Sequence, residues 1–103
     1  MSIIKEAGEI LVYIYNNRHN SPSSFKIAED TKKNLKTIHE ALDYLEKDYI
    51  IQIGSRRANG NRCSIELEPI GIRLIENKPE FKRTFGFEVN LGLFKFKWGA
   101  SEK

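Results

Sequence analysis

The stretch IQIGSRRANGNRCSIEL, at residues 51–67, gathers three arginines around an Asn-Gly pair. No acidic residue lies within residues 54–63 to neutralise them. A guanidinium group carries a permanent positive charge and presents several N–H donors in one plane, so it binds phosphate oxygens well. The chemistry that these residues predict is therefore the binding of a polyanion. The candidate binding residues of this stretch are Arg56, Arg57, Asn59, Asn61 and Arg62.

The elements that hold these arginines are predicted by the apolar residues on either side. Apolar and polar residues alternate over residues 51–54 and 63–68, which is typical of two β-strands. If the Ala-Asn-Gly sequence at residues 58–60 forms a three-residue loop, with its glycine left-handed, Ile53 faces Ile65 and one side of the ribbon is wholly apolar. A two-residue Asn-Gly turn would instead oppose Ile53 to a glutamate. We therefore expect the three-residue loop.

The expected register also sets Arg56 directly opposite Arg62 on the solvent face of the ribbon. Like charges in directly opposed positions destabilise a β-ribbon. Phosphates, or a narrow minor groove with its negative potential, would offset this repulsion. The register therefore strengthens the prediction of a nucleic-acid contact.

Three segments before the ribbon show the apolar spacing of amphipathic helices. They are residues 3–16, the short segment FKIAEDT that follows Ser24, and residues 34–47. We expect Ser24 to cap the second helix, because its side chain can accept a hydrogen bond from a free amide of the first turn. The third helix is expected to start at Asn34. The apolar stripe of the third helix consists of Leu35, Ile38, Leu42 and Leu45.

The segment EPIGIRLIEN, which follows the ribbon, predicts a short fourth helix. Pro69 is suited to its first turn, because the amide hydrogen that proline lacks has no partner there. Pro79 is expected to end the helix. Its expected core residues are Ile70, Leu74 and Ile75.

This order of elements resembles the winged helix-turn-helix domain of bacterial and archaeal transcription regulators, including the MarR-like and ArsR-like groups. The resemblance covers about residues 3–77 and is carried by FKIAEDTKKNLKTIHEALDYLEKDYIIQIG, by the ribbon and by PIGIRLIE. Ile27-Ala28 and Thr37-Ile38 fill places in the pattern, whereas Tyr49 stands where such proteins commonly have glycine. The resemblance implies that the third helix enters the major groove of DNA and that the ribbon is a wing on the backbone or the minor groove.

The first turns of the third helix would then lie against the bases, since recognition helices read DNA mainly with their N-terminal residues. The outer face of this helix carries more acids than lysines, and each acid near a phosphate lowers the affinity for DNA. These acids are Glu40, Asp43, Glu46 and Asp48. Glu40 can also accept a hydrogen bond from a cytosine amino group. The residues that would lie at the DNA are Lys33, Asn34, Lys36, Thr37, His39 and Glu40.

The C-terminal segment FKRTFGFEVNLGLFKFKWGASEK predicts a β-hairpin with one aromatic face. A four-residue turn NLGL would pair aromatic residues across the hairpin and set Glu88 opposite Lys95 on the other face. The aromatic face is too large to leave in water. Two interpretations stay open: the face packs on the domain's own core, beside the first helix, or it forms a homodimer or partner interface. Its residues are Phe85, Phe87, Phe94, Phe96 and Trp98.

The composition fits one soluble domain of 103 residues, with 40% hydrophobic and 30% charged residues and a net charge of only +3. No apolar run reaches the ~20 residues that span a bilayer, and the N-terminus lacks a signal-peptide pattern. We therefore expect a cytoplasmic protein without a membrane partner. The abundance of isoleucine, lysine and glutamate is typical of thermophile proteins and suggests an archaeal-like source.

Catalysis and metal binding find little support in the sequence. Its single cysteine, Cys63, excludes an internal disulfide and a cysteine-built metal site, and its place on the apolar side of a strand predicts a small buried side chain. There is no glycine-rich phosphate loop, no pair of carboxylates with a convergent pocket and no Cys/His nucleophile pair. We expect no enzyme activity and no cofactor.

These observations predict an α+β protein with a winged helix-turn-helix domain at residues 1–78 and a C-terminal β-hairpin at residues 79–103. The expected domain has three helices, a two-stranded wing and a short fourth helix. Its expected function is sequence-specific binding of double-stranded DNA by a homodimeric transcription regulator. The alternative is a winged-helix protein-interaction module without DNA binding, in which the acidic helix and the aromatic tail meet another protein.

Overall fold

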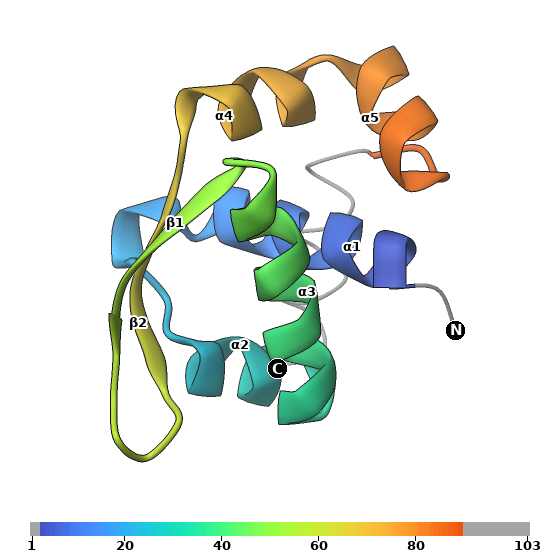
Figure 1. Ribbon diagram of the computed structural model, residues 1–103. Coiled ribbons are helices and arrows are strands. Elements are labelled where there is room, and N and C mark those ends of the chain that lie inside the picture. The colour runs from blue at the N-terminus through green and yellow to red at the C-terminus, as the bar shows by residue number, and fades with distance from the viewer. Residues whose placement is uncertain (1–2, 90–103) are drawn as a thin grey trace.

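The computed structural model describes residues 3–89 of the chain. Their helices and strands are α1 (Ile3–Asn16), the 3₁₀ helix η1 (Arg18–Asn20), α2 (Ser24–Thr31), α3 (Leu35–Lys47), β1 (Ile51–Arg56), β2 (Arg62–Leu67), α4 (Pro69–Glu76) and α5 (Lys78–Phe85). Figure 1 shows α1, α2 and α3 before the two-stranded wing, with α4 and α5 after it. The expected α+β winged helix-turn-helix is confirmed. Within the described residues, no helix is long and apolar enough to cross a membrane.

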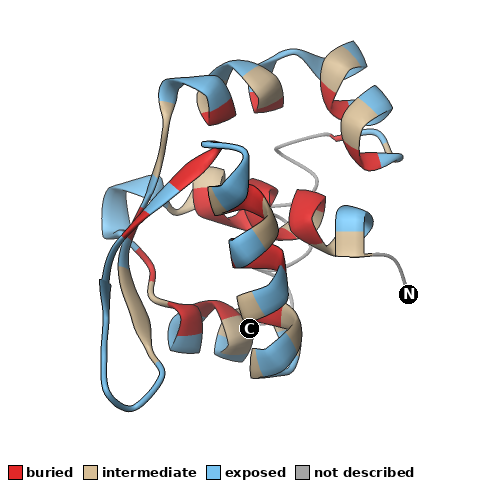
Figure 2. Cartoon of the chain, viewed as in Figure 1, coloured by how far each residue is buried: buried red, intermediate tan, exposed pale blue. Residues whose placement is uncertain are grey.

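Helix α1 forms the centre of the core. Its Ile10 and Leu11 are fully buried, and α3 packs on α1 with Ile38 and Leu42, which are also fully buried. These two α3 residues belong to the expected apolar stripe, whereas Leu35 at the start of that stripe is only partly buried. Figure 2 shows the buried positions along α1 and on the inner side of α3, while the wing is exposed over its loop and the outer half of β1.

Helices α2 and α3 of the helix-turn-helix are each capped at the N-terminus by a side chain. The third helix starts at the expected place, and Asn34 caps it, since its side-chain oxygen accepts the backbone N–H of Thr37 at 2.8 Å. The cap of α2 is Ser23 and not Ser24, since the Ser23 hydroxyl accepts the N–H of Lys26. Ser24 is instead the first residue of the helix and is fully buried, which leaves its hydroxyl free for other partners.

The chain leaves α3 through a left-handed residue. Tyr49 has a φ of 61°, and the N–H of Ile50 donates to the carbonyl of Leu45 at 3.0 Å, which closes the last turn. Glycine is the usual residue in this conformation because it has no Cβ to clash. Tyr49 therefore takes a backbone conformation that glycine adopts more readily, with its side chain 72% exposed.

The wing has the register that the apolar face predicts. Ile53 pairs with Ile65, Arg56 pairs with Arg62, and the loop is the expected Ala-Asn-Gly at residues 58–60. Gly60 has a φ of 92°, which confirms the left-handed position. Burial of the isoleucines on the inner face selected this register over the alternative, because a shift of one residue would expose them.

Helix α4 packs on the start of the wing through a glycine. A Cβ at Gly71 would collide with the carbonyl oxygen of Ile50, so the close approach of α4 needs glycine at this position. Ile75 is buried as expected, but Ile70 is 47% exposed and does not join the core. The expectation for Ile70 was wrong because it follows Pro69 in the first turn, where the helix has only begun to cover the domain.

The segment after α4 is a helix, so the predicted C-terminal hairpin is wrong over its described part. Pro79 does not end α4 but lies in the first turn of α5, whose cap is Asn77, with the Asn77 side chain accepting the N–H of Glu80 at 3.2 Å. Gly86, with a φ of 85°, ends the helix. Phe85 is thus a helical residue and cannot begin a strand.

Helix α5 covers α1 with aromatic side chains. The Phe81 ring lies 4.8 Å from that of Phe85 and 5.3 Å, edge-on, from that of Phe87. A Cβ at Gly8 of α1 would collide with Phe85 and Phe87, so these rings lie against the glycine. The first of the two open interpretations, packing beside α1, therefore holds for Phe85 and Phe87. The other predicted aromatic residues lie outside the described part of the chain: Phe94, Phe96 and Trp98.

Candidate nucleic-acid interface

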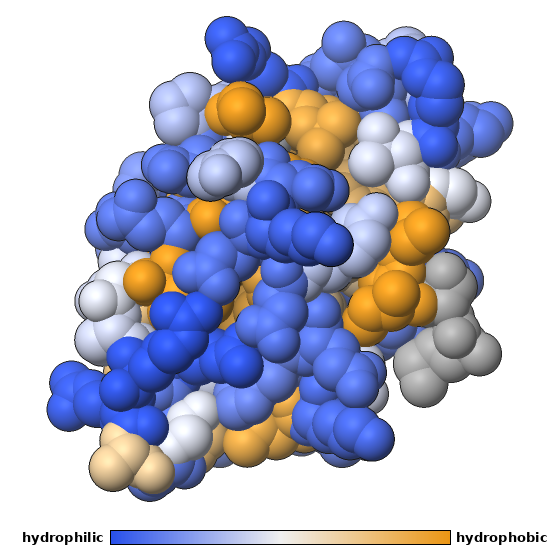
Figure 3. Space-filling view, viewed as in Figure 1, coloured by the Kyte–Doolittle hydropathy of each residue, from blue (hydrophilic) through white to orange (hydrophobic). Residues whose placement is uncertain are grey.

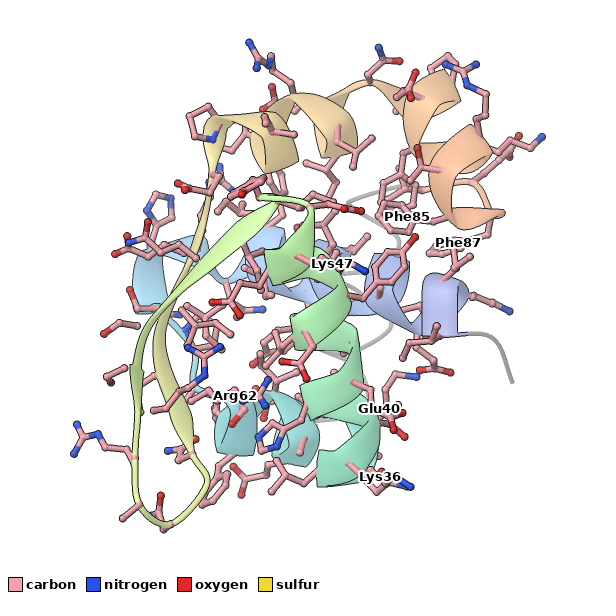
Figure 4. All side chains as sticks on the ribbon, viewed as in Figure 1. Lys36, Glu40, Lys47, Arg62, Phe85 and Phe87 are labelled. Carbon is pink, nitrogen blue, oxygen red and sulfur yellow. The ribbon has the colours of Figure 1, made fainter. Side chains whose placement is uncertain are left out.

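The N-terminal half of α3 is open on its outer side. Asn34, Lys36 and Glu40 are exposed and Thr37 is partly buried. Figure 4 shows Lys36 and Glu40 projecting from α3 on the side away from the wing. Although they are spaced four residues apart, no ion pair involves Lys36 or Glu40 within residues 3–89. Both side chains remain available to a ligand.

Lys33, in the turn between α2 and α3, faces the core side of the molecule instead. Its ammonium lies 2.7 Å from a carboxylate oxygen of Glu6 and 2.8 Å from one of Glu9, both on α1. Burial alone would lower the pKa of Lys33, but the hydrogen bonds to the two carboxylates outweigh it and raise the pKa above its ordinary value. Lys33 therefore stays charged and ties the turn to α1.

Two of the three wing arginines are paired with acids of α3. Arg62 donates to the carboxylate of Asp43 at 2.6 Å, and Arg56 donates to the carboxylate of Glu46 at 2.6 Å. We call these contacts the wing–helix ion pairs. They offset the repulsion between the opposed arginines from within the chain. The acidic outer face of α3 and the basic ribbon, which seemed to oppose each other in the sequence, are thus partners over these four residues.

Arg57 and the loop form the outer end of the wing. Arg57 is exposed, and within residues 3–89 its side chain has no acidic partner. Asn59 is exposed as well, and its side-chain oxygen accepts the N–H of Asn61 at 3.0 Å, which stiffens the loop. Cys63 is only partly buried, against expectation, because the wing extends beyond the core at this point. The unneutralised cation of the wing is therefore at its tip.

The loop end of the wing is joined to the N-terminus of α2 by Ser24. The Asn61 side-chain oxygen accepts the backbone N–H of Phe25 at 3.0 Å and the Ser24 hydroxyl at 3.2 Å. The backbone N–H of Arg62 donates to the same hydroxyl at 2.9 Å. Asn61 thereby satisfies an amide in the first turn of α2 that has no partner within the helix. Its side chain is used inside the protein.

His39 completes this junction. Its Nε2 lies 3.1 Å from the Ser24 hydroxyl, and its backbone carbonyl accepts a hydrogen bond from Arg62 at 3.2 Å. Burial lowers the pKa of the His39 imidazole, the Arg62 guanidinium lowers it further, and Asp43 only partly opposes them. Figure 4 shows Arg62 between the wing and α3. His39 thus belongs to the joint between wing and helix more than to the open face of α3.

The predicted residues fall into two groups. Exposed and available to a ligand are Asn34, Lys36, Glu40, Arg57 and Asn59, with Thr37 partly buried beside them. Joined to other parts of the protein are Lys33, His39, Arg56, Asn61 and Arg62. Sequence reasoning missed Ser24, Asp43 and Glu46 as partners of the wing. The spacing of Asp43 and Glu46, three residues apart on one helix face, was the available signal, but only the tertiary structure shows the arginines opposite them.

The sequence matches no protein-family model and no curated protein. Its structure is similar to two crystal structures from Staphylococcus aureus. One is MepR, a transcription regulator of the multidrug efflux pump MepA, with 21% identity and a TM-score of 0.58 over 94% of this chain and 58% of that chain. The other is a MepR mutant from a multidrug resistant clinical isolate, with 20% identity and a TM-score of 0.58 over 94% of this chain and 73% of that one. This similarity establishes the fold.

Proposed function

Because the chain has the winged helix-turn-helix fold found in a known transcription regulator, we propose that it binds double-stranded DNA in a sequence-specific manner and regulates transcription. One observation carries the proposal. The open N-terminal half of α3 and the cationic tip of the wing lie at the same end of the molecule. A helix for the major groove beside a ribbon for the adjacent backbone or minor groove is the arrangement by which this fold reads DNA.

In the proposed complex, the exposed residues divide the contacts between bases and phosphates. Lys36 and Arg57 supply charge to the phosphates, and Asn34, Thr37 and Glu40 meet base edges in the major groove. Asn59 adds a hydrogen-bonding group beside Arg57. Hydrophilic residues cover the wing and the outer side of α3 in Figure 3, which suits a wet, polar nucleic-acid interface.

The proposal includes a homodimer in the cytoplasm, without enzyme activity or cofactor. A single domain of this size offers few phosphate contacts, and a second copy on a second half-site would raise the affinity without any new kind of contact. The protein-interaction alternative rested on the acidic face of α3 and on the aromatic tail. Since Asp43 and Glu46 of that face bind wing arginines, the acids no longer favour a basic protein partner over DNA.

A salt titration tests the proposal. The full chain is titrated with fluorescent duplex and single-stranded DNA of random sequence, and anisotropy is followed over a series of salt concentrations. We expect duplex binding that weakens steeply with salt. Arg57→Ala should lower the slope of log K against log salt by about 0.9, the value for one lost phosphate contact.

The matched control is Arg73→Ala, which removes an exposed arginine from α4, away from the tip of the wing (Figure 1). It should leave the slope unchanged. If the wild-type chain binds no duplex even at the lowest salt, or prefers single strands, the proposed function is wrong.

A further inference from the structure

We propose that Asp43 and Glu46 are positioning residues for DNA binding, which fix the wing beside α3 through the wing–helix ion pairs. Arg56 and Arg62 then hold the wing in place and do not themselves bind phosphate. This inference rests on the proposed function, because it concerns how the same interface is set. It reverses the roles that the sequence suggests, in which the acids oppose DNA and all three arginines grip it.

The geometry of the four side chains supports this assignment. Asp43 and Glu46 are three residues apart on α3 and so lie on neighbouring positions of one helix face. Arg56 and Arg62 are cross-strand partners at the loop end of the wing, in the last pair before the loop. Each arginine meets one acid at 2.6 Å, so the four charges cancel locally. An arginine bound in this way offers phosphate less net charge than Arg57 does.

The same place carries the neutral contacts between wing and helices. Ser24, which is fully buried, accepts the backbone N–H of Arg62, and the carbonyl of His39 accepts the Arg62 guanidinium. A two-stranded ribbon is only marginally stable by itself. Contacts at its loop end therefore decide where the tip lies, because Arg57 directly follows Arg56 in the chain. The wing–helix ion pairs and the hydrogen bonds of Ser24 together attach the wing to α2 and α3.

The proposal predicts a change in DNA affinity opposite to the one that charge repulsion alone predicts. Removal of a carboxylate from a DNA-facing helix should strengthen binding to any duplex, because one repulsion is lost. If Asp43 and Glu46 position the wing, their removal should weaken binding instead, because the tip no longer meets the backbone. Glu40 provides a matched comparison, since it is a carboxylate of the same helix without an ion pair in the described residues.

The experiment measures binding of the full chain to a random-sequence duplex over a salt series. We expect Asp43→Asn and Glu46→Gln each to weaken binding by roughly twofold to fivefold, the range of an exposed ion pair. Glu40→Gln should tighten binding to this random-sequence duplex by a similar factor, because no fixed base is present to donate to Glu40 and only its repulsion of the phosphates is lost. Thermal melting confirms that each variant is folded. If Asp43→Asn and Glu46→Gln tighten binding as Glu40→Gln does, the acids only oppose DNA and the proposal is overturned.

A charge exchange gives the second, independent readout. Arg62→Asp should weaken binding, and the double variant Asp43→Arg/Arg62→Asp should recover it to within about twofold with the wild-type salt slope, because the pair is restored in reverse. If the double variant binds as weakly as Arg62→Asp and its slope is lower, Arg62 contacts phosphate itself and the proposal fails. A wild type that binds no duplex is a different result, which refutes the proposed function together with the positioning role.

Discussion

At the scale of single residues, Tyr49 takes a backbone conformation that suits glycine better. Its φ is 61° and its side chain is 72% exposed, so the ring gains little from packing while the Cβ is strained. We expect Tyr49→Gly to raise the free energy of unfolding by about 1 kcal/mol. Urea unfolding followed by circular dichroism measures the change.

The neighbouring Asp48 is the control for this prediction. Its φ is −96°, where glycine has no advantage, so Asp48→Gly should not stabilise the protein. A Tyr49→Gly variant that is less stable than the wild type would mean that the exposed ring makes contacts that outweigh the strain of its backbone.

Residue types alone do not separate the arginines that bind a ligand from those that bind the protein. Arg56, Arg57 and Arg62 are chemically equivalent in the sequence, and only the position of α3 beside the wing distinguishes them. The same holds for Lys33, whose acids on α1 are distant in the sequence. The sequence therefore indicates which segments form the candidate site. It does not indicate the role of each residue, because that role depends on contacts between residues distant in the chain.

At the scale of elements, local signals explain what could be predicted. The wing register follows from burying Ile53 and Ile65, and the start of α3 follows from its Asn34 cap. Helix α5 was missed because Phe85 and Phe87 alternate as in a strand, although a helix signal was present. An asparagine cap, a proline in the first turn and a glycine at the end mark the segment from Asn77 to Gly86 as a helix.

Helix α5 is expected to be essential for the stability of the domain. Phe81 of α5 is fully buried in the core and contacts two other aromatic rings. Phe81→Ala should lower the free energy of unfolding by about 3–5 kcal/mol, because a large buried ring leaves a cavity. Calorimetry or urea unfolding would measure the loss, with the exposed Lys82→Ala on the same helix as the control. Equal stability of the two variants would contradict the packing of α5 as part of the core.

At the scale of the whole molecule, the chain spans 58% of the length of the MepR chain. Residues 90–103, outside the described part, hold the aromatic residues left over once Phe85 and Phe87 pack on α1. We expect a homodimer that uses these side chains. A triple variant, Phe94→Ser/Phe96→Ser/Trp98→Ser, should stay folded and sediment as a monomer, whereas the wild type sediments as a dimer.

Analytical ultracentrifugation with parallel circular dichroism separates the outcomes of this test. If the variant unfolds, these residues belong to the core of one chain. If the wild type is already a monomer at the concentrations of DNA binding, the homodimer is wrong, and any symmetry in the binding site must have another source.

The wing–helix ion pairs also have a consequence for how this sequence can change over evolutionary time. The partners are 19 and 10 positions apart in the chain. A mutation of Asp43 leaves Arg62 without its counterion, so lineages that lose one partner should tend to lose or exchange the other. Arg57 has no such partner in the described residues, so under the proposed function it would vary with the DNA site alone. If the ion pairs hold the wing, homologous sequences should show correlated substitutions at 43 with 62 and at 46 with 56. Position 57 should vary independently of them.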